Sequence, residues 1–95
     1  MFDLTGKTGL ITGGAGSIGL ASARLLREQG MRLALVDHDQ ASLARAVTAL
    51  GGGDDVMVIE ADVADEASVQ DYVAQTVARF GAIDFLFSNA GNFGT

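Results

Sequence analysis

A short glycine-rich segment contains residues that suit the binding of a phosphate group. Residues 12–19 read Thr-Gly-Gly-Ala-Gly-Ser-Ile-Gly and lie between an apolar run and an amphipathic run. Glycines allow a tight turn and let a ligand approach the backbone without a Cβ in the way. The amides of a first helical turn have no partners within the helix and carry the positive end of its dipole. The segment therefore predicts a strand–turn–helix unit that binds a pyrophosphate, although an ordinary tight connection is the alternative. The residues expected at the phosphates are Gly13, Ser17, Ile18 and Gly19.

An acidic residue follows this segment at the distance expected of a ribose ligand. Asp37 lies 18 residues past Gly19, at the end of the next apolar run. A carboxylate at about this distance accepts hydrogen bonds from ribose hydroxyls and repels a 2′-phosphate. Asp37 could instead cap the following helix, but Asp39 is better placed for that role. No Lys or Arg occupies positions 14–17 or 38, so the expected cofactor is NAD rather than NADP.

The elements that must position these residues alternate along the chain. Apolar runs predict strands over 8–12, 32–37, 56–60 and 84–88, and helical periodicity predicts helices over 17–29, 40–50 and 65–80. Helices between successive strands indicate right-handed crossovers and a parallel sheet covered on both faces. The fold class is therefore α/β, a doubly wound parallel sheet with the strand order 3-2-1-4. Carboxyl ends of parallel strands share one edge, so Thr12, Asp37, Asp62 and Asn89 should lie near each other.

The helical periodicity also predicts which residues face the sheet and which begin the helices. Apolar side chains recur on one face of the first helix, at Ile18, Ala21, Leu25 and Leu26. Asp39 and Asp65 are expected to cap the second and third helices. His38 is expected to be an exposed loop residue.

Composition narrows the class of protein. The 95 residues suffice for one small domain, and the net charge of −6 argues against nucleic acid or an anionic membrane as partner. There is no cysteine, which excludes disulfides and thiolate metal sites, and no metal site is expected. No apolar run has the length of a membrane span and no signal-peptide pattern is present, so a cytoplasmic location is the default expectation.

Four motifs in order resemble the N-terminal part of a short-chain dehydrogenase/reductase. They are the opening Phe2-Asp3-Leu4-Thr5-Gly6-Lys7, the segment Leu10-Ile11-Thr12-Gly13, the pair Asp62-Val63 and the turn Ser88-Asn89-Ala90-Gly91. Together they cover the whole chain and favour the single-domain branch of that family. The resemblance implies a Rossmann fold, with residues 1–95 as the N-terminal portion of one NAD-binding domain.

The resemblance also implies an activity and further site residues. Members of the family transfer a hydride between a nicotinamide cofactor and a carbonyl or alcohol, and they often form homo-oligomers. Asp62 and Val63 would meet the adenine, and Asn89, Ala90 and Gly91 would line a ribose. The chain would thus be the adenosine- and pyrophosphate-binding half of an NAD-dependent oxidoreductase that acts on a small molecule.

Two departures from the family pattern leave alternatives open. Ser17 stands where the single-domain branch has a glycine, and the glycines at 13, 16 and 19 fit the spacing of the extended branch of sugar-nucleotide epimerases and dehydratases. The family's catalytic Tyr-x-x-x-Lys would lie beyond Thr95, and Tyr72 cannot replace its tyrosine. The apolar strand over 85–87 would leave an open edge, so we expect a part of a longer protein that holds no catalytic residue and is inactive alone. A non-catalytic dinucleotide-binding fragment is the remaining alternative.

Overall fold

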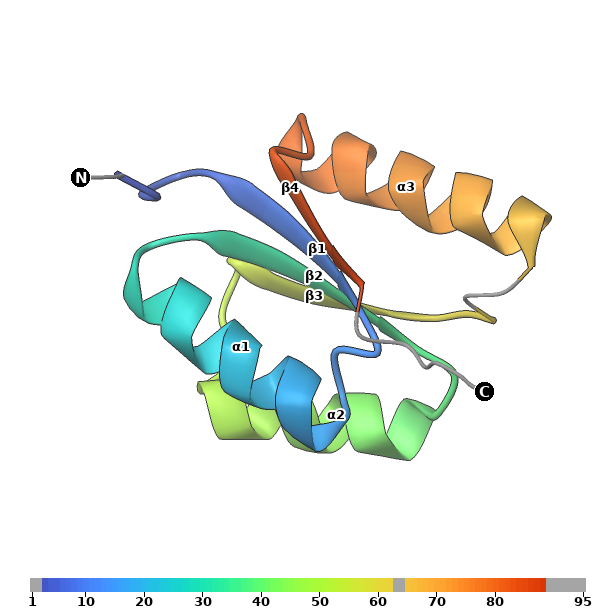
Figure 1. Cartoon of the computed structure of the whole chain (residues 1–95), viewed down its shortest axis with the longest axis horizontal. Coiled ribbons are helices and arrows are strands. Elements are labelled where there is room, and N and C mark those ends of the chain that lie inside the picture. The colour runs from blue at the N-terminus through green and yellow to red at the C-terminus, as the bar shows by residue number, and fades with distance from the viewer. Residues whose placement is uncertain (1–2, 63–64, 89–95) are drawn as a thin grey trace.

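The chain folds into one parallel sheet with helices on both faces. The computed structural model describes residues 3–62 and 65–88. The elements in chain order are β1 (Thr8–Thr12), α1 (Ser17–Glu28), β2 (Arg32–Asp37), α2 (Gln40–Leu50), β3 (Val56–Glu60), α3 (Glu66–Phe80) and β4 (Phe85–Ser88). The order across the sheet is β3-β2-β1-β4, and all three pairings are parallel. The predicted doubly wound sheet and its 3-2-1-4 order are therefore confirmed (Figure 1).

Side chains that alternate along the strands divide the core into two layers. Ile11, Leu33 and Leu35 pack with α1 and α2 on one face. Leu10, Ala34 and Val36 pack with Tyr72 and Phe80 of α3 on the other. The strands β1 and β2 are buried on both faces, which is why their sequences are almost continuously apolar. Figure 1 shows α1 and α2 on one side of the sheet and α3 on the other.

The predicted inner face of α1 is wrong. Ile18 and Leu25 are 72% and 64% exposed, whereas the buried residues of this helix are Gly19 and Ala23. Only Leu26 of the four predicted residues packs against the core and is partly buried. The small residues let α1 lie close to the sheet, and an apolar periodicity that favours large side chains overlooks them. Its end is also one residue earlier than predicted, at Glu28.

Of the two predicted helix caps one is confirmed, and the predicted apolar edge strand is present. Asp39 caps α2, because its carboxylate accepts a hydrogen bond from the Ala41 amide at 3.1 Å. Asp65 stands at the N-cap of α3 and accepts a hydrogen bond from the Ser68 hydroxyl at 3.1 Å, but its side chain does not cap a backbone amide of this helix as expected. Among the described strands β4 is an edge strand, and its apolar side chains Phe85 and Leu86 are exposed, as predicted.

Asp84 lies just before β4 rather than within it. Its Oδ2 accepts a hydrogen bond from the Thr8 amide at 2.8 Å, and its own amide donates to the Thr8 carbonyl at 2.9 Å. These two bonds fix the start of β4 beside β1. Among residues 3–62 and 65–88, no helix is long and apolar enough to cross a membrane.

Candidate functional site

The glycine-rich turn after β1 is held against the end of β2. Gly13 has a φ of +69°, a conformation that favours glycine. The amides of Gly13 and Gly14 both donate to the Val36 carbonyl, at 2.7 and 3.2 Å. A Cβ at Gly14 would come within 3.0 Å of the Leu35 side chain. The turn is thus fixed by backbone bonds and by close packing on β2.

Beyond the turn, the N-terminus of α1 presents amides on an open surface. Gly16 is the N-cap residue and provides no side-chain cap, and the helical bonds begin where the Leu20 amide donates to the Gly16 carbonyl at 2.8 Å. The amides of Ser17, Ile18 and Gly19 come before that bond and have no intrahelical acceptor. A Cβ built on Gly16 would find only the Gly13 carbonyl oxygen within 4 Å, at 3.5 Å. An anion can therefore approach these amides, and the geometry fits a pyrophosphate.

Gly19 is required by the fold itself. A Cβ at this position would lie 2.2 Å from the Gly13 carbonyl oxygen and 2.9 Å from the Gly14 Cα. The residue is buried, so its missing side chain serves the packing of α1 on the turn rather than the approach of a ligand. The expectation that Gly19 contacts a phosphate stays a prediction, and it can rest only on the backbone amide.

Asp37 joins the end of β2 to the glycine-rich turn. Its Oδ2 accepts a hydrogen bond from the Ala15 amide at 3.1 Å, and its Oδ1 accepts one from the His38 amide at 2.8 Å. The residue is only 9% exposed. An ionised carboxylate has about four acceptor positions, two on each oxygen. His38 Nδ1 also lies 3.1 Å from Oδ1, whereas Oδ2 keeps one position beside the Ala15 amide. The sequence predicted the place of Asp37, but the spacing gave no sign that the Ala15 amide would bind it.

The other carboxyl ends meet at the same edge, as expected. Thr12 pairs in register with Val36 of β2 and with Ser88 of β4, and its hydroxyl donates to the Ser88 hydroxyl at 3.3 Å. Asp37 pairs with Glu60. Asp62 is exposed, and its carbonyl accepts from the amide of the residue that precedes α3. Four predicted site residues lie outside the described residues: Val63, Asn89, Ala90 and Gly91.

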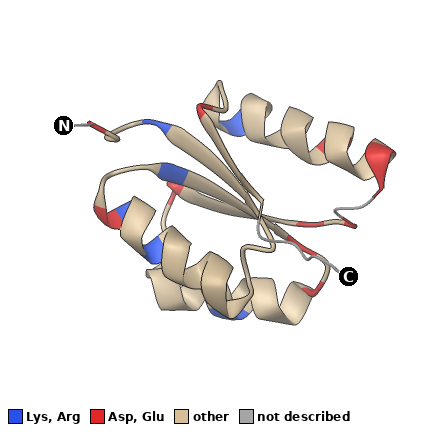
Figure 2. Ribbon diagram, viewed as in Figure 1, with Lys and Arg blue, Asp and Glu red and all other residues tan. Residues whose placement is uncertain are grey.

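Charge is distributed unevenly over the two ends of the sheet (Figure 2). Acidic residues follow the carboxyl ends of the strands, among them Asp37, Asp39 and Glu60. The Arg45 guanidinium of α2 reaches the cluster of Asp39 and Ser42, where it donates to the Ser42 hydroxyl at 3.0 Å. No Lys or Arg occurs in residues 13–19, so backbone amides would have to bind a phosphate at the glycine-rich turn. No group of three or more metal-ligating side chains occurs in the same part.

A hollow between α1 and α2 lies away from this edge. It measures about 380 Å³ and is lined by the C-terminal turns of α1 and α2, at Arg24, Arg27, Glu28, Ala49 and Leu50. Helix C-termini carry partial negative charge, which disfavours an anion. The Arg27 guanidinium already donates to the Leu50 carbonyl. This hollow is not the site that the sequence predicts.

A parallel sheet in the order β3-β2-β1-β4, with a glycine turn between β1 and a helix N-terminus, defines a Rossmann fold of the nucleotide-binding class. The family model described as short chain dehydrogenase matches residues 7–95. The chain therefore belongs to the short-chain dehydrogenase family, which confirms the resemblance found in the sequence.

Known relatives agree with this assignment. The chain is 43% identical over 91 residues to 2,5-dichloro-2,5-cyclohexadiene-1,4-diol dehydrogenase of Sphingobium indicum, which covers 95% of this chain and 35% of the relative. The structure of NAD⁺-bound xylitol dehydrogenase is similar at 38% identity and a TM-score of 0.89, and the match covers 99% of this chain and 36% of the xylitol dehydrogenase chain. The C-domain of a bacterial malonyl-CoA reductase with NADP matches 98% of this chain and 16% of its own, at 33% identity and a TM-score of 0.85. The chain spans about a third of the length of the curated relatives that it matches.

Proposed function

We propose that this chain is the adenosine- and pyrophosphate-binding part of an NAD-dependent oxidoreductase. The contact between the Ala15 amide and Asp37 Oδ2, at 3.1 Å, carries the proposal. It places a candidate ribose ligand directly beside a turn that suits phosphates. Ribose and pyrophosphate are neighbours in a dinucleotide, so one ligand can reach both groups.

Each part of this edge has a separate task in the proposed site. The first amides of α1 bind the pyrophosphate, with Ser17 adding a hydroxyl that can donate to a phosphate oxygen. The free acceptor position of Asp37 binds a ribose hydroxyl of the adenosine, and its negative charge selects NAD over NADP. By resemblance, Asp62 and Val63 meet the adenine, and Asn89, Ala90 and Gly91 line a ribose. The nicotinamide, when bound, supplies or accepts the hydride, and the substrate is a small carbonyl compound or alcohol.

Calorimetric titration of NAD⁺ into the purified protein tests the proposal. We expect saturable binding and a loss of affinity of roughly tenfold or more in Asp37→Asn, since hydrogen bonds to a charged group contribute about 1.5–3 kcal/mol. Asp71→Asn is the matched control, because this carboxylate on α3 is exposed and accepts a hydrogen bond from the neighbouring Gln75 side chain, away from the turn. Absence of NAD⁺ binding would refute the proposed function. Equal affinities of Asp37→Asn and the control would refute the role of Asp37.

Two alternatives from the sequence are tested by the activity of the longer protein, because residues 1–95 alone are expected to be inactive. A non-catalytic dinucleotide-binding protein would, even in that longer form, bind NAD⁺ without oxidising any alcohol in a substrate panel. An extended-branch epimerase would act on a sugar nucleotide instead, but the relatives described above are dehydrogenases and a reductase, which favours the oxidoreductase. A homo-oligomeric state and a cytoplasmic location stay predictions.

A further inference from the structure

Gly14 is a glycine that neither the family patterns nor its backbone conformation requires. The two glycine spacings compared in the sequence use positions 13, 16, 17 and 19 and leave position 14 open. The φ of Gly14 lies outside the left-handed region, so any residue could adopt its backbone conformation. The residue is nevertheless buried. What matters at position 14 is therefore the space that a side chain would fill.

The space beside Gly14 is closed by two neighbours that are held in the core. A Cβ on Gly14 would lie 3.0 Å from the Leu35 Cβ, 3.1 Å from the Leu35 Cδ2 and 3.1 Å from the Ile11 carbonyl oxygen. Leu35 is fully buried under α1, and Ile11 pairs in register with Leu35 on one side and with β4 on the other. Neither neighbour can give way without repacking the core. The glycine-rich turn thus rests directly on Leu35.

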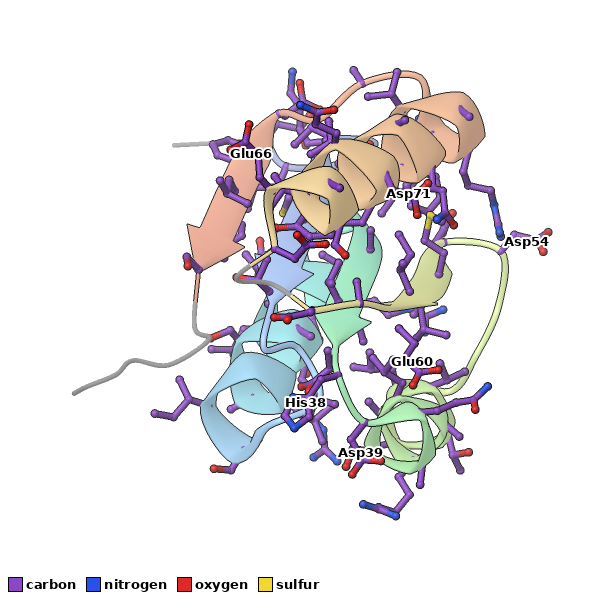
Figure 3. The ribbon with its side chains drawn as sticks, turned by 90° about the vertical axis from the view of Figure 1, so that its right-hand side faces the viewer. His38, Asp39, Asp54, Glu60, Glu66 and Asp71 are labelled. Atoms are coloured by element: carbon purple, nitrogen blue, oxygen red, sulfur yellow. The ribbon has the colours of Figure 1, made fainter. Side chains whose placement is uncertain are left out.

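This contact lies between the two parts of the proposed site. Gly14 comes just before Ala15, whose amide donates to Asp37 Oδ2 at 3.1 Å. Leu35 comes two residues before Asp37 on the same strand. The turn leads into α1, whose first amides are the proposed phosphate ligands, whereas Asp37 is the proposed ribose ligand. Figure 3 looks toward the carboxyl ends of the strands, where His38 marks the end of β2.

We propose that the contact between Gly14 and Leu35 sets the distance between the ribose-binding carboxylate and the phosphate-binding amides, so that both are positioning residues. The proposal rests on the proposed function. A larger group at the contact lifts the turn from β2. The amide of Gly13 is bound to the Val36 carbonyl at 2.7 Å, so the longer bonds from the amides of Gly14 and Ala15, at 3.2 and 3.1 Å, should lengthen first. A dinucleotide must reach both parts at once and then loses part of one contact.

The experiment compares a ligand that spans both parts with fragments that reach only one. NAD⁺, adenosine and inorganic pyrophosphate are titrated into the wild type and Gly14→Ala, and backbone amide shifts give the dissociation constants. A changed distance weakens the spanning ligand alone, whereas general damage weakens all three. We expect NAD⁺ to bind about fivefold more weakly to Gly14→Ala, as for the loss of about one hydrogen bond. Both fragments should bind as they do to the wild type.

Gly9→Ala is the matched control. It makes the same substitution on the same face of the sheet, and its Cβ would lie 3.0 Å from the Met31 Cε. Gly9 is the second residue of β1, away from the carboxyl edge. The variant should therefore leave the binding of all three ligands unchanged.

Leu35→Ile is a second variant, and it decides the question if circular dichroism shows that Gly14→Ala does not fold. The two side chains have the same volume, and such core replacements are tolerated. Isoleucine branches at the Cβ that lies nearest to Gly14, so NAD⁺ alone should again bind more weakly. Leu33→Ile is its control, because Leu33 is equally buried in the same layer but lies two residues further from the turn.

Unchanged NAD⁺ affinity in Gly14→Ala or in Leu35→Ile would overturn the proposal. Equal weakening of all three ligands would also overturn it, as would the same loss of NAD⁺ affinity in Gly9→Ala as in Gly14→Ala. If neither fragment bound the wild type, the two parts would not act separately and the proposal would fail. All these results leave NAD⁺ binding by the wild type intact. Failure of the wild type to bind NAD⁺ would instead refute the proposed function, and this inference with it.

Discussion

The close packing of α1 on the glycine turn predicts that Gly19→Ala destabilises the protein. The added Cβ would meet the Gly13 carbonyl oxygen at 2.2 Å and the Gly14 Cα at 2.9 Å. Both are backbone atoms, so no side-chain rotation relieves the contact and the helix must move. Such overpacking costs about 1–3 kcal/mol, occasionally more, against a gain of about 1 kcal/mol in helix propensity. We place the clash at the upper end and expect a net loss of about 2 kcal/mol, or about 10 °C in Tm.

Gly16→Ala is the matched control for this prediction. Its Cβ would lie no closer than 3.5 Å to any neighbour, and the φ of Gly16 is −76°, which any residue adopts. Alanine is a poorer N-cap than glycine, so we expect a loss below about 1 kcal/mol. Urea unfolding followed by far-UV circular dichroism measures both variants. If Gly19→Ala were no less stable than Gly16→Ala, the close packing of α1 on the turn would be disproved.

Three further predictions concern selectivity, the edge strand and pH. Asp37→Arg should shift the preference from NAD⁺ toward NADP⁺ by roughly tenfold or more, and an unchanged ratio of dissociation constants would contradict the role of Asp37. Asp84→Ala removes the acceptor of the Thr8 amide, and Thr8 is only 2% exposed. The free energy of unfolding, measured in urea, should therefore fall by about 1–3 kcal/mol. A urea midpoint equal to that of the wild type would contradict this. Burial raises the pKa of Tyr72, so the unfolded chain ionises first and the free energy of unfolding should fall above about pH 10. The Tyr72→Phe variant should lose this part of the pH dependence. An identical fall in the free energy of unfolding of the wild type and of Tyr72→Phe would contradict the prediction.

Strands, their order and the meeting of their carboxyl ends could be predicted from the sequence. The almost continuous apolar run of β2, ending in Asp37, indicates a strand buried on both faces. The helices between strands then leave few topologies for a parallel sheet. The place of Asp37 beside the turn follows from that topology.

The orientation of α1 could not be predicted in the same way. Apolar periodicity gives weight to Ile18 and Leu25, whereas the contact with the turn depends on the absence of a side chain at Gly19. Hydrogen bonds between residues that lie far apart in the sequence could not be predicted either. The bond from the Ala15 amide to Asp37 spans 22 positions, and the bond from the Thr8 amide to Asp84 spans 76.

The central claim is that NAD⁺ binds at the carboxyl edge, between the N-terminus of α1 and Asp37. The most direct test is to follow backbone amide resonances of ¹⁵N-labelled protein while NAD⁺ is added. We expect saturable shifts that are largest over residues 13–20 and at His38. No saturable shift, or shifts centred on the hollow lined by Arg24, Arg27 and Leu50, would contradict it.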